Sequence, residues 1–179
     1  MLQENLIRMY EESFRAHREL PALTDYFKGE TFSYYEMAKE IAKLHLFFKK
    51  AEIRRGDKIA LVGRNNPRWC ITYLATITYG AVIVPILQDF APADIVHIVN
   101  HSESRLLFVG DNYWDIIEED EIARIDAVLS LTDFHVIYER RGKSLGVYMR
   151  DMVKNYRAKY KRGLSLIHIS EPTRLALIS

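Results

Sequence analysis

Residues 56–87 read GDKIALVGRNNPRWCITYLATITYGAVIVPIL. Within this stretch, the short apolar run at 58–62 follows a Gly-Asp pair and predicts a strand that is buried on both faces. Asn66-Pro67 is typical of a helix start, with the asparagine as cap and the proline in the first turn. That helix is expected to end before Gly80, and the β-branched run at 81–87 predicts a second buried strand. Two buried strands joined by a helix indicate a parallel pair.

The alternation of strands and helices continues on both sides of this stretch. Apolar spacing predicts further helices and strands, namely helices at 2–16, 34–50, from Pro92 onward, 111–121 and 144–160, and strands at 21–27, 30–32, 104–109, 125–131 and 135–138. Ser33 and Glu36 have the spacing of a capping box at the start of the helix 34–50. The order predicts an α/β fold in which a mostly parallel sheet carries helices on its faces.

The segment from Trp69 to Leu87 has no charged residue over nineteen positions, and that length suffices to cross a bilayer. Gly80 and Pro85 interrupt the segment, and its second half is β-branched. A buried helix followed by a buried strand therefore accounts for these residues better than a transmembrane span.

The chain has 179 residues, of which 49% are hydrophobic and 27% are charged. These proportions are typical of a globular domain and exclude a disordered or collagen-like chain. The single cysteine, Cys70, excludes an intramolecular disulfide and a cysteine-rich zinc module. Charges interrupt the apolar residues at 2–14, so no secretory signal is expected there. We therefore expect a reducing, cytoplasmic location.

The net charge of +1 argues against a nucleic acid partner, but it hides an asymmetry. Residues 1–139 carry a net charge of −7, whereas residues 140–162 carry nine basic residues and one acid. One stripe of the helix expected at 144–160 is apolar and consists of Leu145, Tyr148, Met149, Met152, Tyr156 and Tyr160. We expect this stripe to dock on the domain and the basic face to be solvated. The alternative is a helix that binds lipid or nucleic acid.

Two groups of residues have the spacing of metal ligands. His97 and His101 are one helical turn apart and could share a metal ion. No third ligand is evident, and two surface histidines are the better interpretation. The acidic run at 118–121 lacks the alternating ligands and the glycine turn of a calcium loop, so a solvated helix end is expected.

Two further positions could serve chemistry. Residues 63–66 join a strand to a helix, where phosphates bind in open α/β sheets. They contain one glycine rather than a nucleotide fingerprint, and the simpler interpretation is a short helix start. Cys70 lies among apolar residues without an evident base, so a buried small residue is expected. The residues by themselves identify no catalytic, cofactor-binding or metal site.

Five short motifs occur in order along the chain. They are TFSYYEM (31–37), GDKIALV (56–62), NNPRW (65–69), YGAVIVP (79–85) and ADIVHIVNHS (93–102). In this order and spacing they resemble the start of the AMP-forming acyl-CoA synthetases, which are adenylate-forming ligases. Arg68 stands where the family's N-x-P-E-W motif has glutamate. The asparagine, proline and tryptophan of that motif favour the long-chain fatty acid branch.

The resemblance implies a reaction that joins a fatty acid to ATP, releases pyrophosphate and then forms a thioester with coenzyme A (CoA). It also implies Mg²⁺ and a phosphate-binding loop similar to T-S-G-T-T-G, which neutralise the charge of the leaving pyrophosphate. That loop, the adenine-binding segment, the magnesium-binding acid and the C-terminal lid lysine are not found in this sequence. No catalytic, cofactor-binding or metal-binding residue is therefore carried over. This chain alone is expected to be inactive, and the parent enzyme is expected in the cytoplasm, with a peripheral membrane contact as a further expectation.

The far end of the sequence resembles something other than a protein. The run LSLIHISEPTR at 164–174 matches the in-frame translation of a transposase sequencing adapter, and its alternative interpretation is a short strand. Such scars are left out of fold reasoning. We therefore expect residues 1–163 to be a partial N-terminal domain of an AMP-binding enzyme and residues 164–179 to be adapter read-through.

Two other functions stay open at this point. The chain could come from another adenylate-forming ligase that acts on acetate, an aryl acid or an amino acid. It could also be a stand-alone binding module that uses the basic helix at 144–160.

Overall fold

A computed structural model describes residues 6–122 and 124–160. Its central sheet has the spatial order β4-β3-β5-β6-β7. The five strands are β3 (Lys58–Val62), β4 (Val82–Ile86), β5 (Leu106–Val109), β6 (Ala127–Ser130) and β7 (Val136–Glu139). The pairs β3–β4, β3–β5 and β5–β6 are parallel, and β6–β7 is antiparallel. The predicted α/β fold with a mostly parallel sheet is confirmed.

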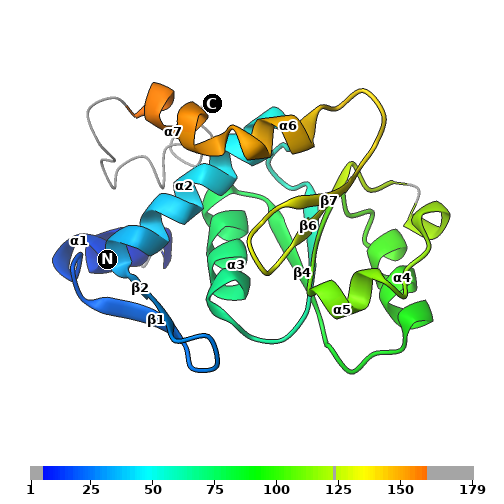
Figure 1. The fold of residues 1–179 in the computed structure, drawn as a ribbon, viewed down its shortest axis with the longest axis horizontal. Coiled ribbons are helices and arrows are strands. Elements are labelled where there is room, and N and C mark those ends of the chain that lie inside the picture. The colour runs from blue at the N-terminus through cyan, green and yellow to red at the C-terminus, as the bar shows by residue number, and fades with distance from the viewer. Residues whose placement is uncertain (1–5, 123, 161–179) are drawn as a thin grey trace, which may run out of the picture.

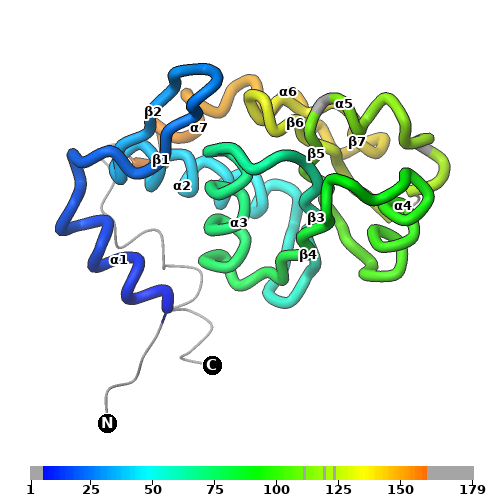
Figure 2. Tube along the Cα trace, turned by 90° about the horizontal axis from the view of Figure 1, so that it is seen from below, coloured from blue at the N-terminus to red at the C-terminus, as the bar shows by residue number. Residues whose placement is uncertain are grey.

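Helices lie on both faces of this sheet (Figure 1). α2 (Tyr34–Lys50) and α3 (Pro67–Tyr79) cover one face, and α4 (Pro92–His101) covers the other. α1 and a separate two-stranded hairpin lie at one end of the molecule, and α4 lies at the opposite end (Figure 2). These elements are α1 (Leu6–Ala16), β1 (Pro21–Asp25) and β2 (Glu30–Ser33). No described helix is long and apolar enough to cross a bilayer.

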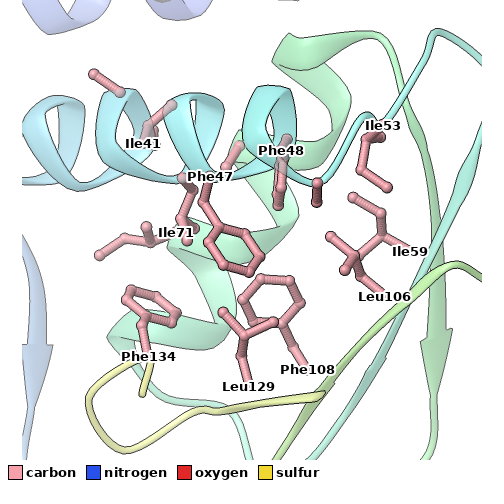
Figure 3. Close-up of a cluster of buried hydrophobic side chains, with 14 of the residues drawn as sticks. Ile41, Phe47, Phe48, Ile53, Ile59, Ile71, Leu106, Phe108, Leu129 and Phe134 are labelled. Atoms are coloured by element: carbon pink, nitrogen blue, oxygen red, sulfur yellow. The ribbon is translucent and has the colours of Figure 1, made fainter. Parts of the chain in front are cut away.

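Alternate side chains of the central strands enter two different cores. In β3, Ile59 and Leu61 join the core under α2 and α3, whereas Ala60 and Val62 join the core under α4. Phe48 and Phe108 meet edge to face in the larger core, with ring centroids 6.2 Å apart (Figure 3). Burial on both faces explains why β3 reads as a continuous apolar run.

The predicted helix caps are present. Ser33 and Glu36 form the capping box of α2, since each side chain bonds to the backbone N–H of the other residue. The Asn66 side chain accepts a hydrogen bond from the Trp69 N–H at the start of α3. Gly80 ends α3 with a φ of +87°, a conformation that glycine adopts without steric cost.

The helix predicted at 111–121 is wrong over most of its length. Only α5 (Asp111–Trp114) is α-helical, and a 3₁₀ turn follows at Glu119–Ile122. Ile117 and Ile122 are both buried in the core under α4. Their spacing of five residues does not fit one helical face, and the four adjacent acids repel one another. The chain therefore turns between the two isoleucines.

The single helix predicted at 144–160 consists of two helices. α6 (Leu145–Arg150) and α7 (Met152–Lys159) meet at Asp151, whose φ and ψ of −84° and 9° end α6. The break leaves the Tyr148 carbonyl without its helical donor, and the Asn155 side chain donates to it instead over 3.2 Å. The predicted docking of the apolar stripe is confirmed, because all six of its residues are buried in or packed against the larger core.

One arginine joins the amino ends of three neighbouring strands. Arg105 directly precedes β5 and forms ion pairs with Asp57 before β3, at 2.9 Å, and Asp126 before β6, at 2.5 Å. The same guanidinium donates to the carbonyls of Ala51 and Glu52 just beyond α2. The amino edge of the sheet is thereby tied to the end of α2.

Replacing Arg105 with methionine should lower the free energy of unfolding by about 3 kcal/mol, because Asp57 loses its ion-pair partner and Asp126 keeps only Arg140 among the described residues, at 3.9 Å. Urea denaturation measures this change. Arg124→Met is the matched control, since the ion pair of Arg124 with Glu103 is exposed and should contribute less than about 0.5 kcal/mol. Equal effects of the two substitutions would contradict a structural role for Arg105.

A buried histidine lies between α2 and α3. His45 Nε2 lies 3.0 Å from the Ala75 carbonyl and 3.1 Å from Thr78 Oγ1. Because a carbonyl only accepts, Nε2 carries the proton. His45 Nδ1 has no hydrogen-bond partner among the described residues. Burial disfavours the charged ring and lowers the pKa of His45 to about 4, although the bond to Ala75 acts in the opposite direction.

This pKa makes stability depend on pH in a defined window. The pKa of His45 is lower in the folded chain than its usual 6.5, so its contribution is fully present above pH 6.5. As the pH falls from 6.5 to about 4, the contribution decreases by about 3 kcal/mol, because the unfolded chain binds the proton first. His45→Gln keeps a donor and does not titrate. The variant should lack this part of the loss when unfolding is measured from pH 7.5 to pH 4, and parallel pH curves would refute the assignment.

Candidate functional site

The connections of the sheet change direction between β3 and β5. From β3 the chain runs through α3 to β4 at one edge, whereas from β5 it runs toward β6 and β7 at the other. The loops that begin at Gly63 and Gly110 therefore leave the carboxyl ends of neighbouring strands in opposite directions. In open α/β sheets, ligands bind in the crevice at such a point. This carboxyl edge is the candidate site.

Two glycines allow close backbone approach at this edge. A Cβ atom at Gly63, where φ is +150°, would lie 2.9 Å from Leu131 Cδ1 and 3.2 Å from the Gly110 nitrogen. The Gly110 N–H donates to the Val62 carbonyl over 3.0 Å, and the Leu131 N–H donates to the Val109 carbonyl over 2.8 Å. The ladder thus continues past the ends of β3, β5 and β6, and a side chain at position 63 would force these ends apart.

The loop at 63–66 is built as a helix start. Asn66 accepts from the Trp69 N–H over 2.9 Å, and Pro67 has no N–H to offer. Two of the three first-turn donors of α3 are therefore used or absent, which makes this a poor cradle for a phosphate. Arg64 and Asn65 are exposed beside it. The predicted helix start at Asn66-Pro67 is confirmed.

Arg68, which departs from the motif of the resembled family, has a specific partner in this chain. Its guanidinium donates two hydrogen bonds to the Glu30 carboxylate, at 2.7 and 2.9 Å. These bonds lower the pKa of Glu30 against the opposing effect of burial. The pair joins the β1–β2 hairpin to the start of α3. This contact accounts for an arginine at position 68 in this chain.

A cavity of about 330 Å³ lies between α2, the turn after β6, and α6 with the start of α7. Its rim carries the ion pair of Glu40 with Lys43 at 2.6 Å and a hydrogen bond between His135 Nδ1 and the Asp133 carboxylate at 2.5 Å. Burial raises the pKa of Asp133, but hydrogen bonds from the His135 backbone and ring outweigh it and lower the pKa overall. These four groups bond in two pairs, and Arg150 also lines the cavity.

The other candidate residues do not converge on this edge. His97 and His101 lie exposed on α4 with their rings stacked 5.7 Å apart. Cys70 is half-buried, and burial raises the pKa of its thiol, which disfavours the reactive thiolate. In the part of the chain that the structure describes, no three potential ligands come together around a metal position.

The family model described as "AMP-binding enzyme" matches residues 10–161. The chain belongs to the AMP-binding enzyme family. The resemblance to adenylate-forming ligases is therefore confirmed, and the carboxyl edge of β3 and β5 is part of a domain of this family.

Two curated relatives illustrate the range of the family. The chain is 24% identical over 119 residues to the fatty acid–[acyl-carrier-protein] ligase ScoC of Streptomyces coeruleorubidus, which covers 66% of this chain and 23% of that protein. It is 28% identical over 127 residues to long-chain-fatty-acid–CoA ligase 6 of Rattus norvegicus, with 67% and 18% covered. The chain thus spans about a fifth of the length of these relatives.

Solved structures agree with this placement. The anthranilate CoA ligase AuaEII in complex with anthranoyl-AMP aligns with a TM-score of 0.69 at 16% identity, over 84% of this chain and 28% of that chain. The N-terminal domain of FACL13 from Mycobacterium tuberculosis aligns with a TM-score of 0.66 at 18% identity, over 83% and 36%. The likeness establishes that this sheet has the fold of one part of an adenylate-forming enzyme.

Gly63→Ala should lower the free energy of unfolding by about 2 kcal/mol, because the added Cβ meets Leu131 and the Gly110 backbone. Gly146→Ala is the matched control within α6. There the new Cβ would find its nearest neighbours at 3.8 Å, and alanine favours a helix over glycine. Urea denaturation of both variants tests the close approach, which is refuted if Gly63→Ala is as stable as the parent chain.

Proposed function

We propose that the chain is the N-terminal part of an ATP-dependent long-chain fatty acid–CoA ligase. The observation that carries this proposal is the AMP-binding enzyme match over residues 10–161. The relative in rat is a long-chain-fatty-acid–CoA ligase, and the asparagine, proline and tryptophan of 65–69 favour the same branch. The parent enzyme would join a fatty acid to CoA at the expense of ATP, with AMP and pyrophosphate as the other products.

The alternative proposal is a ligase of the same family that acts on another acid substrate. One further relative is the 4-hydroxybutyrate–CoA ligase 2 of Metallosphaera sedula, 29% identical over 110 residues, or 58% of this chain and 20% of that protein. The anthranilate ligase has an aryl acid substrate in its name. Long-chain acids are favoured by the motif at 65–69, which is an argument from resemblance. Substrate profiling of the parent enzyme with acetate, benzoate and palmitate distinguishes these cases.

The described residues do not fit ATP or Mg²⁺ by themselves. The start of α3 lacks the free donors of a phosphate cradle, and no described group of three ligands could hold a metal ion. When bound, Mg²⁺ and ATP supply charge neutralisation and the leaving pyrophosphate. We therefore assign no reaction step to residues 6–122 and 124–160, and we place the catalytic groups of the cytoplasmic parent enzyme in other parts of its chain.

The stand-alone binding module is less favoured as a function for the chain. Its apolar stripe along α6 and α7 is already packed against the core and is not available to insert into a lipid surface. We propose that residues 1–163 are a partial N-terminal domain of the ligase. Residues 164–179 follow directly, and we attribute them to adapter read-through. They lie outside the described residues.

The parent enzyme should release pyrophosphate when it is supplied with ATP, Mg²⁺ and palmitate, and residues 1–163 alone should release none. A coupled pyrophosphate assay measures both. The control is the same assay without palmitate. Turnover by residues 1–163 would show that the catalytic groups lie within this part of the chain, and an inactive parent enzyme with every acid tested would refute the ligase proposal.

A further inference from the structure

The cavity beside α6 lies among three parts of this chain. α6 packs against α2 and β7 (Figure 1), and the cavity next to these contacts has a volume of about 330 Å³. Its lining residues fall within 40–152, so the described chain supplies every wall that the cavity has. An apolar cavity of about 150 Å³ holds one benzene molecule, and this cavity therefore has room for a ligand of about twelve non-hydrogen atoms.

The apolar part of the lining suits a flexible chain. It consists of Leu44, Phe134, Val136, Met149 and Met152. Leu44, Phe134 and Met152 are buried. Methionine side chains are unbranched and adapt to the shape of the group that they contact. An unbranched alkyl chain would therefore find matching contacts here and would gain free energy by leaving water.

One lining residue has a backbone conformation that bulky side chains avoid. Phe134 has a φ of +67°, in the left-handed region. Its N–H donates to the Ser130 carbonyl over 3.0 Å, and its ring meets Phe108 edge to face, with ring centroids 6.0 Å apart. Residues held in such conformations cluster where proteins clamp ligands. The turn after β6 thus holds one wall of the cavity in place.

The polar part of the lining leaves one cation for a ligand. Glu40 and Lys43 form an ion pair, and the Asp133 carboxylate accepts from the backbone and the ring of His135. Arg150 is exposed at the cavity and forms no ion pair with a described residue. Its guanidinium carries paired N–H groups that match the two oxygens of a carboxylate.

A further acid near Arg150 already has a partner. The Glu139 carboxylate accepts the Gly146 N–H over 2.7 Å. A Cβ atom at Gly146 would lie 3.8 Å from both Glu139 Oε2 and Arg150 Nη1. The two charged groups are thus neighbours, but they form no ion pair. Arg150 therefore remains available to an anionic group in the cavity.

We propose that this cavity binds an unbranched aliphatic carboxylic acid of about ten carbon atoms, a size that follows from the room for about twelve non-hydrogen atoms. The carboxylate pairs with Arg150, and the alkyl chain packs against the apolar lining. A neutral alcohol of the same length would fill the cavity without this charged hydrogen bond. The proposal goes beyond the ligase function and does not rest on it, since the lining residues need no catalytic group to bind such an acid.

Photoaffinity labelling of the parent enzyme tests the proposal. A decanoic acid that carries a diazirine near the end of its chain should label the peptide containing Met149 and Met152 saturably, as located by mass spectrometry. Excess decanoate should abolish this labelling, and 1-decanol should compete about tenfold more weakly. Arg150→Gln should reduce the labelling about tenfold, for the same reason. The matched control is Arg157→Gln, which removes an exposed charge outside the cavity and should label as the parent does.

A second variant tests the cavity independently of charge. Gly146→Leu adds a side chain to a lining position where a Cβ finds its nearest neighbours at 3.8 Å, and leucine favours a helix over glycine. This variant should lose the labelling without a fall in the thermal midpoint of unfolding.

Three results would overturn the proposal. They are a parent enzyme without saturable labelling of this peptide, an Arg150→Gln variant that labels like Arg157→Gln, and a Gly146→Leu variant that labels like the parent. Pyrophosphate release from ATP with palmitate, measured without decanoate, reports on the ligase proposal separately.

Discussion

The ion-pair cluster around Arg105 is the constraint on which the rest of the sheet depends. Three parallel strands, β3, β5 and β6, begin side by side. Asp57, Arg105 and Asp126 stand directly before them, and the ion pairs of Arg105 with the two carboxylates hold these strand starts together. The same guanidinium reaches the carbonyls of Ala51 and Glu52 beyond α2. Because the strands are aligned at their amino ends, their hydrogen-bonding register is also set at their carboxyl ends. There the backbones at Gly63 and Gly110 lie close together. The candidate site is thus positioned from the far end of its own strands.

Much of the fold could be predicted from local pattern. The strand at 58–62 and the helix at 34–50 match their predicted bounds, because burial on two faces and a capping box leave clear marks in sequence. Two predicted helices, at 111–121 and 144–160, were wrong in part because the chain bends within them. Ile117 and Ile122 required a turn that helical periodicity does not encode, and the break at Asp151 depends on the Asn155 side chain replacing a backbone donor.

The long-range polar contacts were not foreseen. Glu30 and Arg68 lie far apart in sequence, and their pairing depends on how the hairpin folds onto α3. For Arg105 a partial signal was present, since charged residues of alternating sign, Asp57, Arg105 and Asp126, stand at or beside the starts of three predicted strands. That signal becomes readable only when the strand order is known. The chain spans about a fifth of the length of its relatives, and the described residues form no group of three potential metal ligands.

We propose that this sheet is one part of a larger adenylate-forming ligase. The most direct measurement is the nucleotide sequence of the uninterrupted gene beyond the codon for Gly163, obtained from genomic DNA without adapter ligation. We expect an open reading frame that replaces LSLIHISEPTR and soon encodes a phosphate-binding loop similar to T-S-G-T-T-G. A genomic sequence that encodes LSLIHISEPTR and then a natural stop codon would contradict it.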